Sequence, residues 1–336
     1  MMTTKTTTRT LAGFPIFPIG LGCMSLSHGY GPAAAPADAE ALLLGALDRG
    51  VTLFDTAALY GFGHNEELLG RVLAPHRSRF MLASKCGIFR ENGLRRIDGR
   101  PETLRRTCED SLRRLRTDVI DLYYLHRWDK SVPIEDSVGA LADLVRAGKI
   151  RAIGLSEVSA ATLRRAHAVH PVAAVQSEYS LWSREVEIAV LGACRELGAA
   201  LVAFSPLGRA FLADGLPDPA ALDDGDLRRR MPRFQPEALA RNRALLAPLR
   251  RMALDHGCTP GQLALAWLLH QGEDVIPIPG TTRLAHLEEN LGAAGVRLDA
   301  AACDALARLF GRDRVAGERY GPATQAEVDT EQFPAS

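Results

Sequence analysis

Four polar side chains that suit proton-transfer chemistry lie at or just after the ends of short apolar stretches of the sequence. Asp55 and Lys85 each end such a stretch, and His126 directly follows another. Tyr60 comes five residues after Asp55. Short β-rich runs between helical patterns are typical of buried parallel strands. We therefore expect these side chains at the carboxyl ends of neighbouring strands, where α/β proteins place their chemistry.

Lys85 is the most unusual of the four, because the chain has only 4 lysines beside 36 arginines. Lysine is almost never buried unless it is paired, so a lysine ending an apolar strand requires a carboxylate partner. Asp55 is the natural candidate for that partner.

Together these residues could reduce a carbonyl group, which needs a hydride on carbon and a proton on oxygen. A tyrosine phenol, with a pKa of ~10, is a poor acid at neutral pH. A cation about 4 Å away, at an effective dielectric near 20, is worth ~4 kcal/mol and lowers that pKa by roughly 3. We expect Lys85 to lower the pKa of Tyr60, Asp55 to orient Lys85, and His126 to hold the substrate oxygen. Taken singly, each residue could be a cap or part of the scaffold.

The composition of the chain bears on which kinds of binding partner are expected. The net charge is zero, which favours neither nucleic acid nor an anionic membrane. No apolar run reaches 18 residues, so no transmembrane helix is expected. The first ten residues lack the apolar core of a signal peptide, and the six cysteines have no metal-binding spacing. We expect a cytoplasmic protein with reduced thiols, no metal and no nucleic-acid or membrane partner; the oligomeric state stays open.

Strand and helix patterns alternate along the chain, which favours a single (β/α)8 TIM barrel over residues 1–336. A small hairpin (10–18) and a polar end (1–9) precede the barrel. The expected strands are 19–22, 52–55, 80–85, 120–125, 150–155, 173–177, 200–204 and 275–278. The expected helices are 38–49, 65–73, 101–115, 134–147, 159–169, 185–197, 259–271 and 284–293, with two extra helices at 237–256 and 299–310. Long loops should lie at the C-terminal face: 210–236 as a mobile, solvated lid, and 312–336 as a loop or disordered tail.

From about residue 10 to residue 310 the chain resembles the aldo-keto reductase superfamily, and most of all its bacterial and plant branch of pyridoxal- and perakine-reductase-like enzymes. No single motif decides this, but their joint order is specific. The matching motifs are Gly20-Leu21-Gly22-Cys23-Met24, Phe54-Asp55-Thr56-Ala57 with Tyr60-Gly61, Asn65-Glu66, Asp121 to His126, Ile153 to Ser156, Gln176 to Ser180, Ser205 to Arg209, Ile278 to Thr281 and Glu289-Asn290.

The resemblance implies an NADPH-dependent oxidoreductase (EC 1.1.1.-) that reduces an aldehyde or ketone to an alcohol. It makes Tyr60 the general acid, Lys85 and Asp55 its tuning pair, and His126 the positioner. The implied NADP(H) site comprises Gly22, Met24, Ser156, Gln176, Phe204, Ser205, Leu207, Gly208, Arg209, Gly280, Thr281, Thr282, Arg283, Glu289 and Asn290. Within it, Ser156 and Gln176 would hold the carboxamide, Phe204 would stack on the ring, and residues 205–209 would cover the pyrophosphate. Glu289 and Asn290 would bind the adenine.

Residues 280–283 suit the phosphate end of the cofactor that the resemblance implies. They open a predicted helix, whose terminal N–H groups and the Arg283 guanidinium can bind a phosphate. This favours the 2′-phosphate of NADP, although Thr281 and Thr282 could be a simple N-cap. No Gly-x-Gly-x-x-Gly motif indicates a Rossmann site.

Three positions depart from the family pattern. Glu157 stands where many relatives have Asn beside the carboxamide. Ala210 replaces a usual Gly. His286 stands where many relatives carry an Arg for the 2′-phosphate, which leaves Arg283 for that contact.

The sequence indicates a class of substrate. Tyr30, Phe89 and Trp128 are the expected pocket residues, and Met24, Tyr179 and Trp182 belong to the same aromatic and apolar set. Such a set suits aldehydes or ketones with flat or hydrophobic bodies.

Two alternatives come from other classes. One is a cofactor-binding sensor or regulatory subunit on the same fold with little turnover. The other is a metal-dependent barrel hydrolase using Asp55 and His126, which would need a His/Asp ligand cluster. No His-x-His follows the first strand.

Overall fold

The chain folds as a (β/α)8 barrel, as the alternating pattern predicted. The computed structural model describes residues 8–27, 29–91, 94–213, 216, 218 and 221–333. One parallel sheet has the order β3-β4-β5-β8-β9-β10-β11-β12. Its strands are β3 (Leu21–Gly22), β4 (Leu53–Asp55), β5 (Met81–Cys86), β8 (Ile120–Leu125), β9 (Ile150–Ser156), β10 (Val172–Glu178), β11 (Ala200–Phe204) and β12 (Val275–Pro277).

Hydrogen bonds between the first and last strands close the barrel. The amide of Gly20 donates to the carbonyl of Pro277 (3.0 Å), and that of Gly22 donates to Pro279 (3.2 Å). A Cβ at Gly22 would lie 2.8 Å from the Ile278 carbonyl oxygen. Glycine is therefore required where the two strands approach.

Two apolar layers explain why the strand sequences are apolar on both faces. Alternate side chains such as Leu53, Met81 and Leu122 form a cluster inside the barrel. The intervening ones, such as Phe54 and Leu82, pack in a second cluster with the surrounding helices. Buried parallel strands need this two-sided hydrophobicity.

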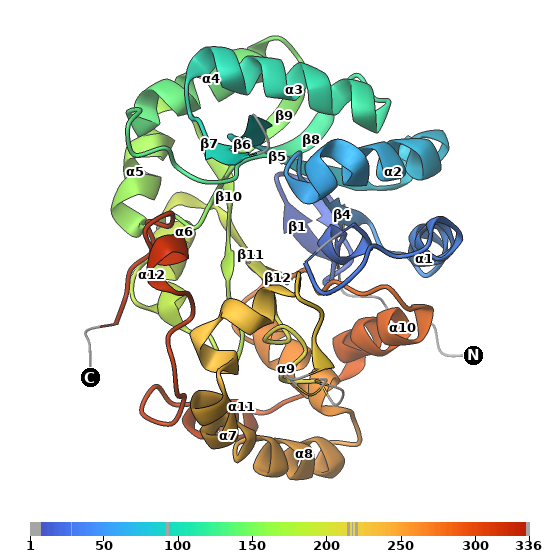
Figure 1. Ribbon diagram of the computed structural model, residues 1–336, viewed down its shortest axis with the longest axis vertical. Coiled ribbons are helices and arrows are strands. Elements are labelled where there is room, and N and C mark those ends of the chain that lie inside the picture. The colour runs from blue at the N-terminus through green and yellow to red at the C-terminus, as the bar shows by residue number, and fades with distance from the viewer. Residues whose placement is uncertain are drawn as a thin grey trace.

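Helices surround the sheet (Figure 1). They are α1 (Pro36–Asp48), α2 (His64–Leu73), α3 (Pro101–Leu115), α4 (Ile134–Arg146), α5 (Ala160–Val169), α6 (Val190–Leu197), α7 (Pro236–Arg243), α8 (Leu246–Asp255), α9 (Pro260–Leu269), α10 (Leu284–Gly292), α11 (Ala300–Leu309) and α12 (Pro322–Gln325). None of the helices in the described ranges combines the length and hydrophobicity needed to cross a membrane.

The predicted N-terminal hairpin is confirmed as β1 (Arg9–Leu11) and β2 (Phe14–Ile16), paired antiparallel. Leu11 and Ile16 join the cluster inside the barrel. The expected polar end was too long, because the buried guanidinium of Arg9 donates to the carbonyls of Val275 and Leu269. Residues 1–7 lie outside the described residues.

Two predicted helices were wrong in detail. The helix expected at 237–256 is divided into α7 and α8, since Pro248 lacks an amide hydrogen and fits only the first turn of a new helix. The helix expected at 185–197 starts as a 3-10 turn (Glu185–Glu187), and α6 begins after Ala189, whose φ of −154° is not helical. An antiparallel hairpin, β6 (Ile88–Glu91) with β7 (Leu94–Ile97), was not predicted.

The two long loops at the C-terminal face are more buried than expected. In 210–236, the described part contains buried Asp226, Arg228 and Arg233, so a fully solvated lid is wrong there. Residues 214, 215, 217, 219 and 220 of this loop lie outside the described residues. The tail includes α12 and buries Arg319 and Tyr320, so residues 312–333 form an ordered segment. Residues 334–336 lie outside the described residues.

Candidate active site

A buried lysine lies at the centre of the predicted catalytic group. The ammonium of Lys85 donates to the carboxylate of Asp55, to the carbonyl of Thr56 (2.8 Å) and to the phenol oxygen of Tyr60 (3.1 Å). An ammonium group has three donors, and these three acceptors use all of them. Because the phenol oxygen accepts from Lys85, the phenol's own proton points away from the lysine.

The barrel brings these residues together from three strands. Asp55 ends β4 and is in register with Ala83 of β5, two residues before Lys85. The amide of His126, which follows β8, donates to the carbonyl of Cys86 (2.9 Å). The rings of Tyr60 and His126 lie edge to face, with centroids 5.9 Å apart. Structure and sequence therefore agree on which four side chains gather at these strand ends.

Lys85 lowers the pKa of Tyr60, as expected, but burial outweighs this effect. Burial raises the pKa of the phenol, Lys85 lowers it, and Asp55 raises it again, with a net result above 10.0. Burial lowers the pKa of the Lys85 ammonium. Asp55 and Tyr60 raise it by more, so this pKa lies above its ordinary value. The pair therefore consists of a protonated lysine and a protonated phenol at neutral pH.

The two residues expected to hold a carboxamide are neighbours on adjacent strands. Ser156 on β9 and Gln176 on β10 are in register, and both are buried. The amide nitrogen of Gln176 donates to Asp55 (2.7 Å), so both carboxylate oxygens of Asp55 are engaged. Arg127 donates to the hydroxyl of Ser156 (3.2 Å). A guanidinium cannot accept a hydrogen bond, so the hydroxyl proton of Ser156 is directed elsewhere.

The loop after β11 is built on left-handed backbone. Ser205, Gly208, Arg209 and Ala210 have φ of +48°, +57°, +57° and +74°. A Cβ at Gly208 would lie 2.9 Å from the indole of Trp182. Phe204, which precedes the loop, is partly exposed. Leu207 is likewise partly buried within the loop.

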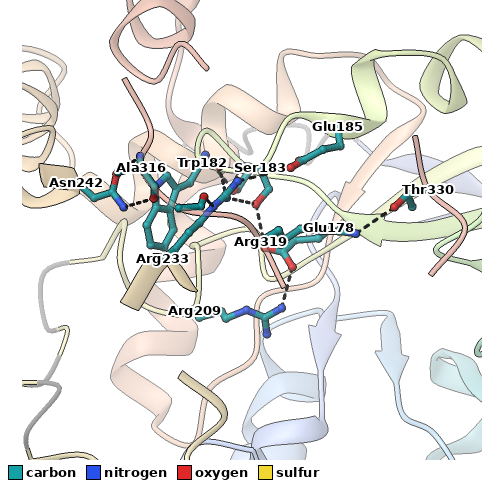
Figure 2. A network of polar contacts seen from close by, with 12 residues as sticks. Glu178, Trp182, Ser183, Glu185, Arg209, Arg233, Asn242, Ala316, Arg319 and Thr330 are labelled. Carbon is teal, nitrogen blue, oxygen red and sulfur yellow. Dashed lines mark hydrogen bonds and ion pairs between the residues drawn. The ribbon is translucent and has the colours of Figure 1, made fainter. Parts of the chain in front are cut away.

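Arg209 was expected at the pyrophosphate, but its guanidinium is buried in contacts within the protein. It pairs with Glu178 (2.7 Å) and donates to the phenol oxygens of Tyr30 (3.0 Å) and Tyr320 (3.4 Å). Figure 2 shows Arg209 directed at Glu178. The side chain is thus a link between segments of the chain.

Glu157, one of the family departures, faces the C-terminal segment. Its two carboxylate oxygens accept from the guanidinium of Arg319 at 3.1 and 2.6 Å. The side chains of this ion pair are 0% and 4% exposed. One oxygen also accepts from the amide of Glu178 (2.9 Å). Both oxygens of the carboxylate are therefore engaged by protein groups.

The expected adenosine-phosphate end lies at the barrel closure and on α10. Gly280 forms a parallel bridge with Gly22, and Thr281 accepts from the amide of Arg283 (3.1 Å). Arg283 is the N-cap residue of α10. Thr282, Arg283 and His286 are exposed at this end, as are Ala285 and Glu288; Asn290 is buried, and Glu289 accepts from Thr259 (2.7 Å).

The expected aromatic set divides into two groups. Tyr30, Phe89 and Trp128 are partly exposed on loops and on β6 at the C-terminal face, and Met24 begins a 3-10 turn there (Met24–Leu26). Tyr179 and Trp182 are wrong as pocket residues, because they are 0% and 3% exposed. Trp182 stacks on Phe211 with centroids 3.9 Å apart.

Three groups near the site were given no role from the sequence. Arg127 directly follows His126, and that position could have suggested it. Asn65 accepts from Thr56 (2.6 Å) and so fixes α2 against the end of β4. Arg319 had no local signal, since it meets Glu157 from 162 positions away.

The hydrolase alternative requires a metal-ligand cluster near Asp55 and His126. Among the described residues, no group of three or more His, Cys, Asp or Glu side chains could hold a metal ion.

Comparisons with known proteins agree with this geometry. The aldo/keto reductase family model matches residues 18–309. Among solved structures, the chain is similar to a glycerol dehydrogenase from Gluconobacter oxydans, with 29% identity, a TM-score of 0.84, and 95% of this chain and 99% of that one covered.

Two further structures are aldo-keto reductases from Klebsiella pneumoniae, each 27% identical. One is a complex with NADP and acetate (TM-score 0.72; 97% and 99% covered), and the other is a complex with NADPH (TM-score 0.71; 92% and 99% covered). The narrower branch suggested by the sequence stays a prediction. The family match spans most of the chain, and the chain belongs to the aldo/keto reductase family, whose members are oxidoreductases that use nicotinamide cofactors.

Proposed function

We propose that the protein reduces an aldehyde or ketone to an alcohol with NADPH, with Tyr60 as general acid. The observation that carries this proposal is the buried contact of Lys85 with both Asp55 and Tyr60. A lysine held between a carboxylate and a phenol stabilises the phenolate that forms when Tyr60 gives up its proton. The family match and the two NADP(H) complexes among its neighbours support the cofactor class.

The donor set at the barrel mouth fits a nicotinamide carboxamide. The Ser156 hydroxyl already accepts from Arg127, so it can donate to the carboxamide oxygen. The Gln176 amide nitrogen faces Asp55, so its amide oxygen can accept from the carboxamide nitrogen. At the other end, Arg283 and the first turn of α10 offer a guanidinium and N–H groups to a phosphate.

When bound, the cofactor supplies the hydride, and the chain's own residues handle the proton. Tyr60 would donate the proton at its phenol oxygen, since that oxygen accepts from Lys85 and its proton points elsewhere. Lys85 would stabilise the charge left on this oxygen. Asp55 keeps Lys85 in place, and His126, with its ring edge to face with Tyr60, would align the substrate oxygen.

Tyr30, Phe89 and Trp128 lie partly exposed at the C-terminal face, and they suit a carbonyl compound with a flat or apolar body.

The test is a fluorescence titration of the purified protein with NADPH and with NADH, followed by a panel of aldehydes and ketones at saturating cofactor. We expect NADPH to bind more tightly and its nicotinamide absorbance to fall with at least one carbonyl compound. Failure of both cofactors to bind would overturn the proposal. Tight binding without turnover on the whole panel would instead favour the sensor alternative.

A further inference from the structure

The C-terminal segment 312–333 contacts two parts of the proposed cofactor site at once. At one, Arg319 pairs in bidentate fashion with Glu157, the residue directly after Ser156. Glu157 has a φ of +56°, a left-handed conformation that a residue with a Cβ adopts only when its surroundings hold it. The carbonyl of Glu157 also accepts from the amide of Asp329 (2.9 Å).

At the second part, Tyr320 contacts the loop 205–210. Its phenol oxygen accepts from Arg209 (3.4 Å), whose guanidinium also pairs with Glu178 at the end of β10. The side chains of Arg209 and Glu178 are 7% and 5% exposed. Adjacent residues of the segment, Arg319 and Tyr320, therefore reach the carboxamide end and the pyrophosphate loop respectively.

Further contacts fix the segment on both sides of this point. Before it, Arg233 donates to the carbonyl of Gly317 (3.1 Å), and Asn242 exchanges two hydrogen bonds with Ala316. Figure 2 shows Arg233 and Asn242 in this network. After it, the carboxylate of Asp329 accepts from the amide of Ser159 (3.1 Å) at the start of α5. In Figure 1 the segment runs past α6 toward α5.

We propose that Arg319 is a positioning residue, which fastens segment 312–333 onto Glu157 and so holds the carboxamide subsite and the 205–210 loop in one binding-competent arrangement. This inference rests on the proposed function. Charge-assisted bidentate pairs are the strong and geometrically specific ones, and here both members are buried. Removing Arg319 would leave Glu157 as an unpaired buried carboxylate, so Glu157 and its strained backbone would rearrange toward solvent.

The main variant is Arg319→Met, with two readouts. In the cofactor-free protein, hydrogen exchange should speed up by roughly tenfold at the amides of 156–159 and 205–213. In the fluorescence titration, the Kd for NADPH should rise by roughly tenfold or more. Arg319→Lys keeps the charge but not the bidentate geometry, and it should fall between wild type and Arg319→Met.

Two variants serve as controls. Arg77→Met removes an ion pair with the buried Asp121, near the other end of the barrel, and tests whether general destabilisation is enough. Arg95→Met removes the partly exposed ion pair with Glu327 of the same C-terminal segment. Both should leave exchange at 205–213 and the Kd for NADPH within about twofold of wild type.

If Arg319→Met does not fold, Arg319→Lys and Tyr320→Phe decide the question, since Tyr320→Phe removes only the hydroxyl that accepts from Arg209. Wild-type exchange and a wild-type Kd in the folded Arg319 variants would overturn the inference, as would equal effects in Arg77→Met. If the wild-type protein binds no NADPH, the proposed function fails. The exchange measurement then still decides whether Arg319 orders the two subsites.

Discussion

Two buried charge clusters lie at the carboxyl ends of the strands, and they differ in the cation on which they are built. In the first, Lys85 contacts Asp55 and Tyr60. In the second, Arg319 pairs with Glu157, and Arg209 pairs with Glu178. An ammonium is a compact point charge that can shift the pKa of a neighbouring group. A guanidinium always stays charged, and its planar fork can bind both oxygens of a carboxylate. Under the proposed function, the chain thus uses one of its few lysines where a proton is to move and arginines where segments are held together.

The pKa values follow the same division. In the lysine cluster, burial raises the pKa of Tyr60 and Lys85 lowers it. The affinity of the phenol for its proton therefore depends on Lys85. In the arginine cluster, burial raises the pKa of the Glu178 carboxyl, but Arg209, Arg319 and Arg233 bring it below its ordinary value. Glu178 therefore stays ionised at neutral pH. At neutral pH Tyr60 therefore carries a proton that it could donate, whereas Glu178 carries none.

The largest expected effect is that of Tyr60→Phe, which removes only the phenol hydroxyl from the first cluster. Loss of a general acid typically costs 10²–10⁴-fold, so carbonyl reduction should fall below about one per cent of wild type. NADPH affinity should stay nearly unchanged, because the ring's packing is kept. Steady-state turnover and a fluorescence titration with NADPH, on the same preparation, check the loss of activity and the unchanged affinity. Turnover above that level would remove Tyr60 from the proposed role.

Lys85→Met tests whether this cluster is both catalytic and structural. It leaves a carboxylate oxygen of Asp55 without its ion pair, which should cost roughly 3–5 kcal/mol of unfolding free energy. It should also raise the pKa of Tyr60 further, because Lys85 is the main group that lowers it. Reduction needs the protonated phenol, so its rate falls only as pH rises through this pKa, which lies above 10.0 in wild type. The alkaline limb of the pH profile should move to higher pH in the variant.

The matched control is Arg209→Met in the arginine cluster. It also breaks a buried pair and should cost a similar free energy, yet the alkaline limb should stay where wild type has it. Denaturant unfolding and pH profiles of both variants make the comparison. An equal displacement of the limb in both would mean that the two clusters are not functionally distinct.

How far the sequence predicts each cluster depends on how local its signals are. Asp55, Lys85 and His126 each end or follow a buried strand, and parallel strands place such ends together. The four-residue group could therefore be predicted from the order of strands and helices. The direction of the net shift in the Tyr60 pKa could not be predicted, because it depends on how completely the folded protein buries the phenol.

The arginine cluster is different, because its partners are far apart in sequence. Nothing near Arg319 indicates that it meets Glu157, and the polar segment around it has the composition of a solvated tail. The same applies to Arg209, which the family resemblance had placed in the loop that covers the pyrophosphate. By contrast, Pro248 was a usable local signal for the break between α7 and α8.

A third prediction concerns a cation outside both clusters. Arg283 is exposed at the start of α10, and it is the only guanidinium between Gly280 and Asn290. Arg283→Ala should weaken NADPH by about 1.5–3 kcal/mol, or 10- to 150-fold, and change NADH little. Titration of wild type and the variant with each cofactor makes the measurement. Equal losses for both cofactors would refute a 2′-phosphate contact by Arg283.

The smallest expected effect is at Ala210, which follows the arginine cluster's Arg209 and has a φ of +74°. A left-handed conformation costs a residue with a Cβ roughly 1–2 kcal/mol, whereas glycine adopts it freely but loses about 0.5–1 kcal/mol more backbone entropy on folding. Ala210→Gly should therefore stabilise the protein by about 0.5–1 kcal/mol, measured by denaturant unfolding. If Arg209 and Tyr320 hold the loop as proposed, the cofactor affinity should stay within about twofold of wild type. A clear loss of NADPH affinity in this variant would mean that the stiffness of Ala210, and not the arginine cluster, keeps the loop in place.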